Sequence, residues 1–161
     1  MKTGSVSILV AALSCASCSA FAGDVESAGI TVTHSGAQSS TQGGTQRFTG
    51  QVCIDPLFQS NSPSRLSGGM VTFEPGARTA WHTHPLGQTL IVTSGRGWIQ
   101  EWGQERQPMV AGDAVSIPAG VKHWHGATAT TGMTHIALQE ALDGKNVNWL
   151  EHVTDAQYDR P

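Results

Sequence analysis

The sequence predicts an all-β fold, a single antiparallel sandwich or barrel followed by a short C-terminal helix. Between Arg47 and Gln139, short apolar or alternating runs are separated by Gly, Pro and Asp, and no segment before Glu140 keeps a helical period. The length of 161 residues suits one domain. Only the end of the chain differs. Thr154 followed by Gln157 matches a capping box, so we expect a helix within residues 154–161.

Residues 1–22 have the layout of a secretory signal peptide. Lys2 is followed by an apolar run at Ile8–Leu13 and by small residues that end in Ala20-Phe21-Ala22, an A-x-A cleavage site. The apolar run is too short to span a bilayer. We therefore expect cleavage after Ala22 and a secreted or periplasmic protein that is not held at a membrane.

The positions of the cysteines and the net charge limit the possible lipid anchors, disulfides and binding partners. Lipidation at Cys15 or Cys18 is the disfavoured alternative, because neither residue has Leu or Val three positions before it. Cys53 alone would remain after cleavage, so no intramolecular disulfide can form, and we expect it to be buried in a strand. The formal net charge is −3 with 9 Lys and Arg, and no basic patch indicates nucleic acid as a partner.

Three segments follow the expected signal peptide. Residues 23–45 are rich in Ser, Thr, Gly and Gln and should form a flexible lead-in, attached only near Ile30–Val32. Residues 46–153 should form the β domain. Its expected strands include Gly50–Ile54, Met70–Phe73, Thr89–Thr93, Gly97–Glu101, Ala114–Ile117 and Thr134–Leu138. Apolar residues before the helix would cover an edge of the domain or join a dimer interface; they are Trp149, Leu150 and Val153.

Three histidines and a glutamine form the most informative cluster. His82 and His84 are two residues apart in an expected strand, so their side chains share one face. A Pro-Leu-Gly turn can bring Gln88 back beside them, and His123 follows a Pro-Ala-Gly turn in a strand that also offers His125 on the same face. Three imidazoles and one side-chain oxygen suit a divalent first-row metal.

The spacing around these residues resembles the two motifs of the cupin superfamily. The residues that match the first motif are Gly76, His82, His84 and Gly95, with Gln88 at the position of a Glu. The residues that match the second are Gly112, Pro118, Gly120 and His123, while Ala127 replaces its final Asn. The resemblance implies a jelly-roll β-barrel.

A longer resemblance points to the small bacterial manganese cupins with hydroxynitrile lyase activity. It runs from Phe48-Thr49-Gly50 through Ile54–Gln59 to Glu151–Asp155, and its sharpest stretches are WHTHPLGQTLIV and KHWHGA. It implies a divalent metal, Mn²⁺ first, with Fe, Zn and Ni as alternatives. The implied ligands are His82, His84, Gln88 and His123. The positions implied to line the active-site cavity are Thr79, His125, His135 and Gln139.

Gln88 in place of a carboxylate changes the chemistry of such a site. Three neutral imidazoles and a carboxamide leave the full charge on the ion, which favours anionic ligands and disfavours oxidation to a trivalent state. Gln88 also cannot accept a proton. His135 is the candidate base, because strand alternation puts it on one face with Gln139 and a nearby cation would keep it neutral. For His125 the alternatives are an extra ligand, an orienting group and an anion-binding donor.

The longer resemblance, together with the neutral ligand set, implies a metal-dependent lyase that reversibly splits a cyanohydrin into a carbonyl compound and cyanide, with His135 taking the hydroxyl proton. One alternative is a metal-dependent dioxygenase acting on a phenolic substrate. Another is an exported, non-enzymatic module that binds a small anion or carbonyl compound. We expect a small-molecule substrate and a homodimer or homotetramer.

Overall fold

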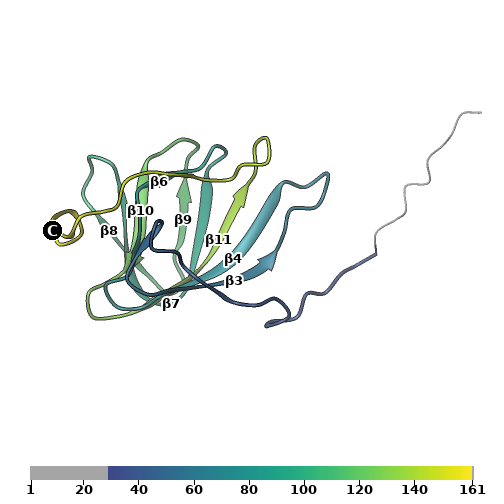
Figure 1. Cartoon of the computed structure of the whole chain (residues 1–161), viewed down its shortest axis with the longest axis horizontal. Coiled ribbons are helices and arrows are strands. Elements are labelled where there is room, and N and C mark those ends of the chain that lie inside the picture. The colour runs from purple at the N-terminus through teal and green to yellow at the C-terminus, as the bar shows by residue number, and fades with distance from the viewer. Residues whose placement is uncertain (1–28, 161) are drawn as a thin grey trace, which may run out of the picture. The chain divides into compact units, whose positions relative to one another are not determined.

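One antiparallel sheet curls around a buried interior (Figure 1). The computed structural model describes residues 29–160, so the signal peptide expected at residues 1–22 lies outside them. From residue 32 onward the chain forms one unit. Within it the main path of the sheet follows the order β1-β3-β4-β11-β7-β10-β5-β2, with β6, β8, β9 and β12 paired to its side. The all-β prediction is confirmed.

The sheet has two halves that share one long strand. The strands of the first half are β1 (Thr41–Gln42), β3 (Val52–Phe58), β4 (Leu66–Phe73), β9 (Ala114–Ile117) and β11 (Met133–Glu140). The strands of the second half are β2 (Phe48–Thr49), β5 (Arg78–Thr79), β6 (His82–Thr83), β8 (Gln107–Val110), β10 (His123–Ala127) and β12 (Asn148–Trp149). Strand β7 (Gln88–Glu101) pairs with β11 and β9 through its first part and with β10 and β8 through its second.

The continuity of β7 corrects the sequence prediction. We expected two separate strands, Thr89–Thr93 and Gly97–Glu101. Instead Gly95 stays in the strand at φ 74°, where a Cβ atom would lie 1.9 Å from the carbonyl oxygen of Gly132. Glycine therefore allows a close backbone approach within the strand rather than ending it. The register of the neighbouring strand shifts at the same level, between Thr134 and His135.

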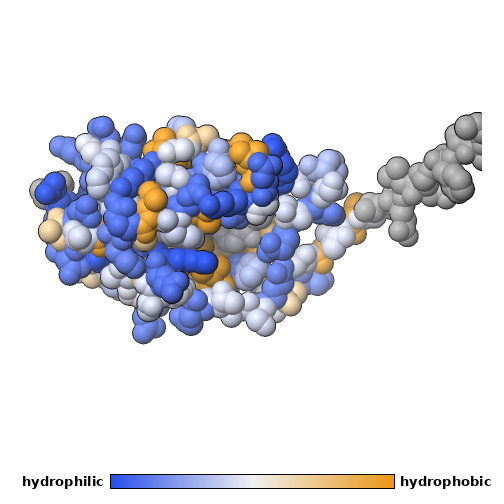
Figure 2. Space-filling view, turned by 45° about the horizontal axis from the view of Figure 1, so that its top comes forward, coloured by the Kyte–Doolittle hydropathy of each residue, from blue (hydrophilic) through white to orange (hydrophobic). Residues whose placement is uncertain are grey.

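Alternating residues on the strands fill the interior. The main cluster of buried apolar side chains draws on both halves of the sheet and includes Phe48, Phe73, Leu90, Ile99, Ile117 and Met133. A second cluster contains Trp81, Trp124, Val153 and Tyr158, so the two tryptophans point away from the face that carries the histidines. The face in Figure 2 is mostly hydrophilic, with separate apolar patches, as outward-facing strand positions require.

The C-terminal segment is fastened across the second half of the sheet. Figure 1 shows this segment in yellow, running from β11 toward β8 and β10. It ends in α1 (Asp155–Tyr158), whose capping box between Thr154 and Gln157 confirms the predicted helix start. Buried Arg78 donates to the carbonyl oxygen of Val153 at 3.1 Å, and the Tyr158 hydroxyl donates to that of Ala127 at 2.9 Å. Residues 29–160 include no helix long and apolar enough to cross a membrane.

The N-terminal attachment also differs from the prediction. Ile30 is fully exposed and Val32 is 69% exposed, so neither is held as expected. The attachment lies later, where β1 pairs with β3 and Gly43 N–H donates to the Val52 carbonyl oxygen at 2.8 Å. Cys53 is half-buried rather than buried, because it alternates with the inward-facing Val52.

The fastening of the C-terminal segment by Arg78 can be tested by unfolding. Arg78→Met would leave the Val153 carbonyl without its donors, so we expect the free energy of unfolding to fall by about 2–3 kcal/mol. Asp155→Asn is the control. Because the Asp155 side chain is 88% exposed, loss of its ion pair with Arg78 should cost below about 1 kcal/mol. Urea titrations measure both; a larger effect for Asp155→Asn would contradict the assignment.

Candidate metal centre

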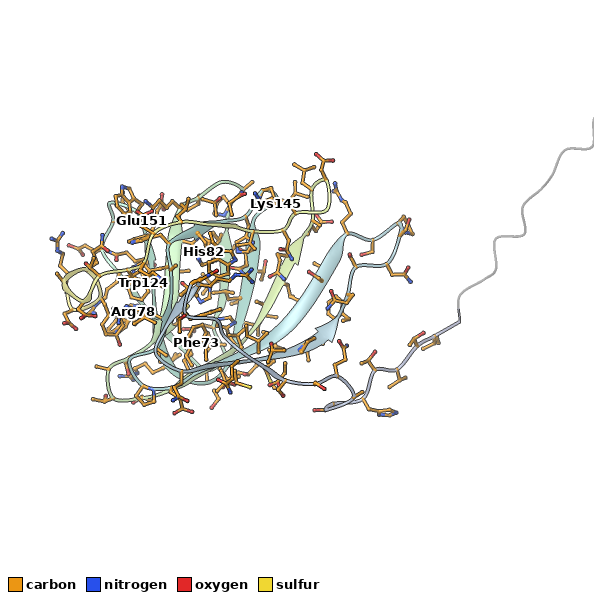
Figure 3. The ribbon with its side chains drawn as sticks, in the orientation of Figure 1. Phe73, Arg78, His82, Trp124, Lys145 and Glu151 are labelled. Carbon is orange, nitrogen blue, oxygen red and sulfur yellow. The ribbon has the colours of Figure 1, made fainter. Side chains whose placement is uncertain are left out.

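The four predicted ligands meet at one end of the barrel interior. His82 on β6 and His123 on β10 are directly paired across the two strands. Gly87, at φ 82°, donates its N–H to the His84 carbonyl oxygen at 3.3 Å and turns the chain so that Gln88 begins β7 beside the histidines. All four side chains are buried, with at most 8% exposed. Figure 3 shows His82 pointing into the interior of the curled sheet.

Main-chain carbonyl groups fix the orientation of the three imidazoles. The Nδ1 atom of His82 lies 2.9 Å from the Ala80 oxygen, that of His84 2.6 Å from the Asn146 oxygen. His123 Nδ1 lies 2.9 Å from the oxygen of Val121. A carbonyl oxygen only accepts hydrogen bonds, so each Nδ1 carries the proton and each Nε2 keeps a lone pair. This is the tautomer and the supporting contact found in metal-ligating histidines.

The oxygen of Gln88 is turned toward these lone pairs. Its amide nitrogen donates to the Gln139 Oε1 atom at 3.3 Å, and its own Oε1 lies 3.3 Å from His123 Nε2. With the His123 proton on Nδ1, two acceptors face each other at that distance. A proton between them is disfavoured, because burial lowers the pKa of His123 to about 4. A cation between them would relieve the repulsion, so the donor set fits a bound metal.

The same end of the barrel holds two further histidines. The ligand atoms of His82, His123 and His125 all lie within 4.8 Å of one another, and His84 falls outside this trio. His125 Nδ1 lies 3.2 Å from His135 Nε2. Within residues 29–160, three buried ring nitrogens find no hydrogen-bond partner: His84 Nε2, His125 Nε2 and His135 Nδ1. The structure therefore brings His125 and His135 to the predicted ligands.

Burial keeps all five imidazoles neutral near pH 7. It is the largest cause of the lowered pKa of His82, His84, His123, His125 and His135. For His135 it lowers the pKa to about 4. Positive charge on neighbouring histidines would lower the pKa of His82 and His125 further. Each ring can therefore offer a lone pair rather than a positive charge.

A cavity of about 190 Å³ is lined by four of these histidines, His82, His84, His125 and His135, and by Gln88. Its polar wall includes Thr79, His125, His135 and Gln139, the four positions implied by the family resemblance. Thr79 Oγ1 accepts the backbone N–H of His125 at 3.1 Å, which leaves the hydroxyl proton of Thr79 free to donate. The apolar part of the lining includes Phe48, Ile54, Val71, Phe73, Ala137 and Trp149.

A larger groove lies outside the barrel. Its volume is about 460 Å³, and its lining includes Trp81, Trp102, Glu105, Gln157 and Arg160. The side chains that form it in the described part of the chain include no histidine. We therefore place the candidate site in the smaller cavity, because chemistry and not volume distinguishes the two.

Two contributors to the site were not recognised as such in the sequence. Asn146 acts through its carbonyl oxygen, which orients His84, and any residue type can offer that group. Trp149 was expected only at an edge or interface; its ring lies 4.8 Å from the ring of His82. Trp149 packs against the main apolar cluster, so the expected cover of the domain is confirmed. Leu150 is 41% exposed, and its contact with a second subunit stays a prediction.

Comparisons with known proteins agree with this geometry. Residues 69–137 match the model of the cupin domain family. The chain is 61% identical over 125 residues to an (R)-mandelonitrile lyase of Granulicella tundricola, covering 78% of this chain and 95% of that protein. A cupin-like protein of Thermotoga maritima has a crystal structure with a TM-score of 0.71 and 38% identity, covering 80% of this chain and 95% of that one. A predicted oxalate decarboxylase of the same species shares the fold, with a TM-score of 0.62 and 19% identity over 70% of this chain and all of that one.

The buried histidines make the stability of the metal-free protein depend on pH. In the unfolded chain a histidine binds its proton near pH 6.5, whereas His123 and His135 bind theirs near pH 4 when folded. Between these values the unfolded state holds more protons, so stability is complete above about pH 6.5 and falls as the pH drops. Each of the two groups should remove on the order of 3 kcal/mol by pH 4. Urea unfolding of EDTA-treated protein measures this, and constant stability between about pH 7 and about pH 4.5 would contradict it.

Proposed function

This chain belongs to the cupin superfamily, and on that premise we propose that it is a metal-dependent hydroxynitrile lyase. It would split a cyanohydrin reversibly into an aldehyde or ketone and cyanide. The observation that carries the proposal is the convergence of neutral lone pairs from His82, His84, His123 and Gln88 beside a cavity with an apolar wall. The identity of 61% to a protein named (R)-mandelonitrile lyase supports the same substrate class.

The ligands proposed for the metal carry no charge. When bound, a divalent cation supplies positive charge that stabilises an alkoxide and a departing cyanide, and no ligand carboxylate reduces that charge. Mn²⁺ is the metal we propose, with Fe²⁺, Zn²⁺ and Ni²⁺ as the alternatives. The same uncharged ligands disfavour oxidation of the metal to a trivalent ion, and therefore disfavour dioxygenase activity. Oxygen uptake on addition of a flavonol or catechol would favour the dioxygenase instead.

The histidine pair is proposed to move the proton. His125 Nε2 would accept the hydroxyl proton while the proton on its Nδ1 passes to His135 Nε2, 3.2 Å away. The carbon–carbon bond then breaks, its electron pair leaves with cyanide, and the oxygen becomes a carbonyl. His135 would hold the proton until it is returned to cyanide or solvent. Because both rings are buried and neutral, they start this transfer as acceptors.

The other residues that line the cavity would position the substrate. Thr79 has a hydroxyl proton to donate toward a nitrile nitrogen or carbonyl oxygen. Gln139 holds the amide of Gln88 and is itself held by a donor bond to Ser67 Oγ at 3.3 Å. The apolar wall with Phe73 and Trp149 suits an aryl or alkyl group on the reacting carbon.

We further propose export from the cytoplasm, on the basis of the N-terminal sequence.

The lyase proposal is tested with racemic mandelonitrile. Mn²⁺-loaded protein should release benzaldehyde well above the buffer rate, followed by absorbance. His135→Ala should lower kcat by about a hundredfold or more, because it removes the group that takes the proton from His125, and general-base catalysis commonly contributes that much. His152→Ala is the matched control, since His152 is an exposed histidine outside the cavity. Release at the buffer rate by protein with full metal occupancy would overturn the lyase proposal, and an unimpaired His135→Ala variant would overturn the role of His135.

Gln88→Glu tests the importance of a neutral ligand set. A carboxylate at this position should bind the cation more tightly and reduce its charge toward the substrate, so we expect stronger Mn²⁺ binding with a kcat/KM lower by at least about tenfold. Metal content after dialysis and initial rates measure the two effects. Equal or higher activity with more tightly bound metal would show that ligand charge does not limit the reaction.

A further inference from the structure

The groove on the outside of the barrel is a second candidate binding site: we propose that it binds a neutral saccharide, with one sugar ring stacked on Trp102. The turn that joins β7 to β8 forms one part of this groove, and Gln157 and Arg160 near the end of the chain form another. Its volume of about 460 Å³ lies within the range of about 300–1,000 Å³ that is usual for ligand sites. The groove is separate from the cavity of the proposed lyase, so the two proposals are independent.

Trp102 offers an aromatic surface that the fold holds in one position. It is 48% exposed, and its backbone N–H donates to the Lys122 carbonyl oxygen at 2.8 Å. The Lys122 ammonium lies 3.4 Å from the centroid of the Trp102 ring, which puts it over one face of that ring. The same ammonium lies 5.6 Å from the Trp81 ring, and the two ring centroids are 4.9 Å apart. Seen from Trp102, Trp81 and the ammonium therefore lie nearly at right angles, so Trp81 meets the ring edge and neither group covers the second face.

The polar side chains of the groove supply both donors and acceptors with no net formal charge. They are the carboxamides of Gln100, Gln104 and Gln157, the carboxylate of Glu105 and the guanidinium of Arg160. The described residues that line the groove include no Ala, Val, Leu or Ile, so a lipid or an apolar chain would meet only the two tryptophans. A neutral ligand rich in hydroxyl groups matches this lining, because a hydroxyl both donates and accepts.

Two of the carboxamides are fixed before any ligand binds. Gln100 Oε1 accepts the Trp124 Nε1–H at 2.7 Å. Gln157 Oε1 accepts the backbone N–H of Thr154 at 2.9 Å and the Trp81 Nε1–H at 3.4 Å. Both bonds of Gln157 use its oxygen, so its amide protons stay available to a ligand. Side chains that are already ordered lose little conformational entropy on binding, which favours recognition at this groove.

A sugar ring combines the two properties that the groove selects for. A pyranose has C–H bonds on its face and hydroxyl groups around its rim. The negative face of an aromatic ring attracts such C–H groups, so stacking on Trp102 would direct the hydroxyls toward the surrounding polar side chains. A proline ring has a similar C–H face. Since proline lacks an N–H, a proline-rich peptide offers no backbone donor to Glu105, and the saccharide is the better match.

Calorimetric titration of the purified protein with cellohexaose, maltohexaose and chitohexaose tests the proposal. The three probes share the pyranose face and differ in linkage and substituents. We expect at least one to bind with a Kd below about 1 mM. Trp102→Ala should weaken that binding by at least about fivefold, whereas Trp102→Phe, which keeps a ring, should retain most of it. Phe58→Ala is the matched control, because Phe58 is a 38% exposed aromatic residue outside the groove.

Two results would overturn the saccharide site: no binding of any of the three probes at millimolar concentration, or binding that Trp102→Ala leaves unchanged. A decaproline peptide that binds more tightly than every probe and depends on Trp102 would assign the groove to peptides instead. Circular dichroism and Mn²⁺ affinity check that Trp102→Ala is folded. Should it not fold, Glu105→Ala decides, because this exposed residue lines the same groove and its loss should also weaken binding.

Discussion

The structure depends on a single electrostatic constraint, the convergence of unprotonated acceptors inside a protein. Three backbone carbonyl oxygens hold the protons of His82, His84 and His123 on the far side of each ring. Burial then removes the water that would otherwise separate the lone pairs, and the hydrogen bond from Gln88 to Gln139 turns one more oxygen toward them. Such an arrangement has no internal partner to balance it. The barrel keeps it together by packing apolar side chains from both halves of the sheet around it, so the fold holds the site in a state that a bound cation would complete.

Strand pairing explains why residues distant in the sequence share this site. His82 and His123 are neighbours because β6 and β10 pair at that level, and Gln88 and Gln139 because β7 and β11 do. Strand β7 connects the two sets, since its ends belong to different halves of the sheet. A slip of one residue in any of these pairings would turn a ligand away from the cavity. The apolar pattern along each strand therefore protects the chemistry as well as the core.

The sequence was informative wherever a local pattern carried the information. Glycine and proline spacing located the turns that return Gln88 and His123 to the site, and the capping box located α1. Alternation placed His135 and Gln139 on the cavity face. Prediction from the sequence failed where the outcome depended on backbone groups distant in the chain. Gly95 lies between two strands that were expected to be separate, yet it continues β7 and allows close approach to Gly132. The support of His84 by Asn146 leaves no mark in residue type, because a main-chain oxygen provides it. The attachment near Thr41 arises because β1 pairs with β3. A strand of two residues is too short to give a recognisable pattern in the sequence.

The C-terminal segment completes the candidate site, so the site can form only after this segment packs on the barrel. Its Asn146 oxygen orients His84, its Trp149 ring lies against His82, and its last turn is fastened by Arg78 and Tyr158. These groups follow β11 in the chain, so the site is complete only when residues 146–158 have docked on the barrel. A metal held by these ligands would therefore be selected in the compartment in which folding ends. Sites of nitrogen and oxygen ligands bind copper and zinc more tightly than manganese in open competition, so the place of folding would decide which ion such a site acquires.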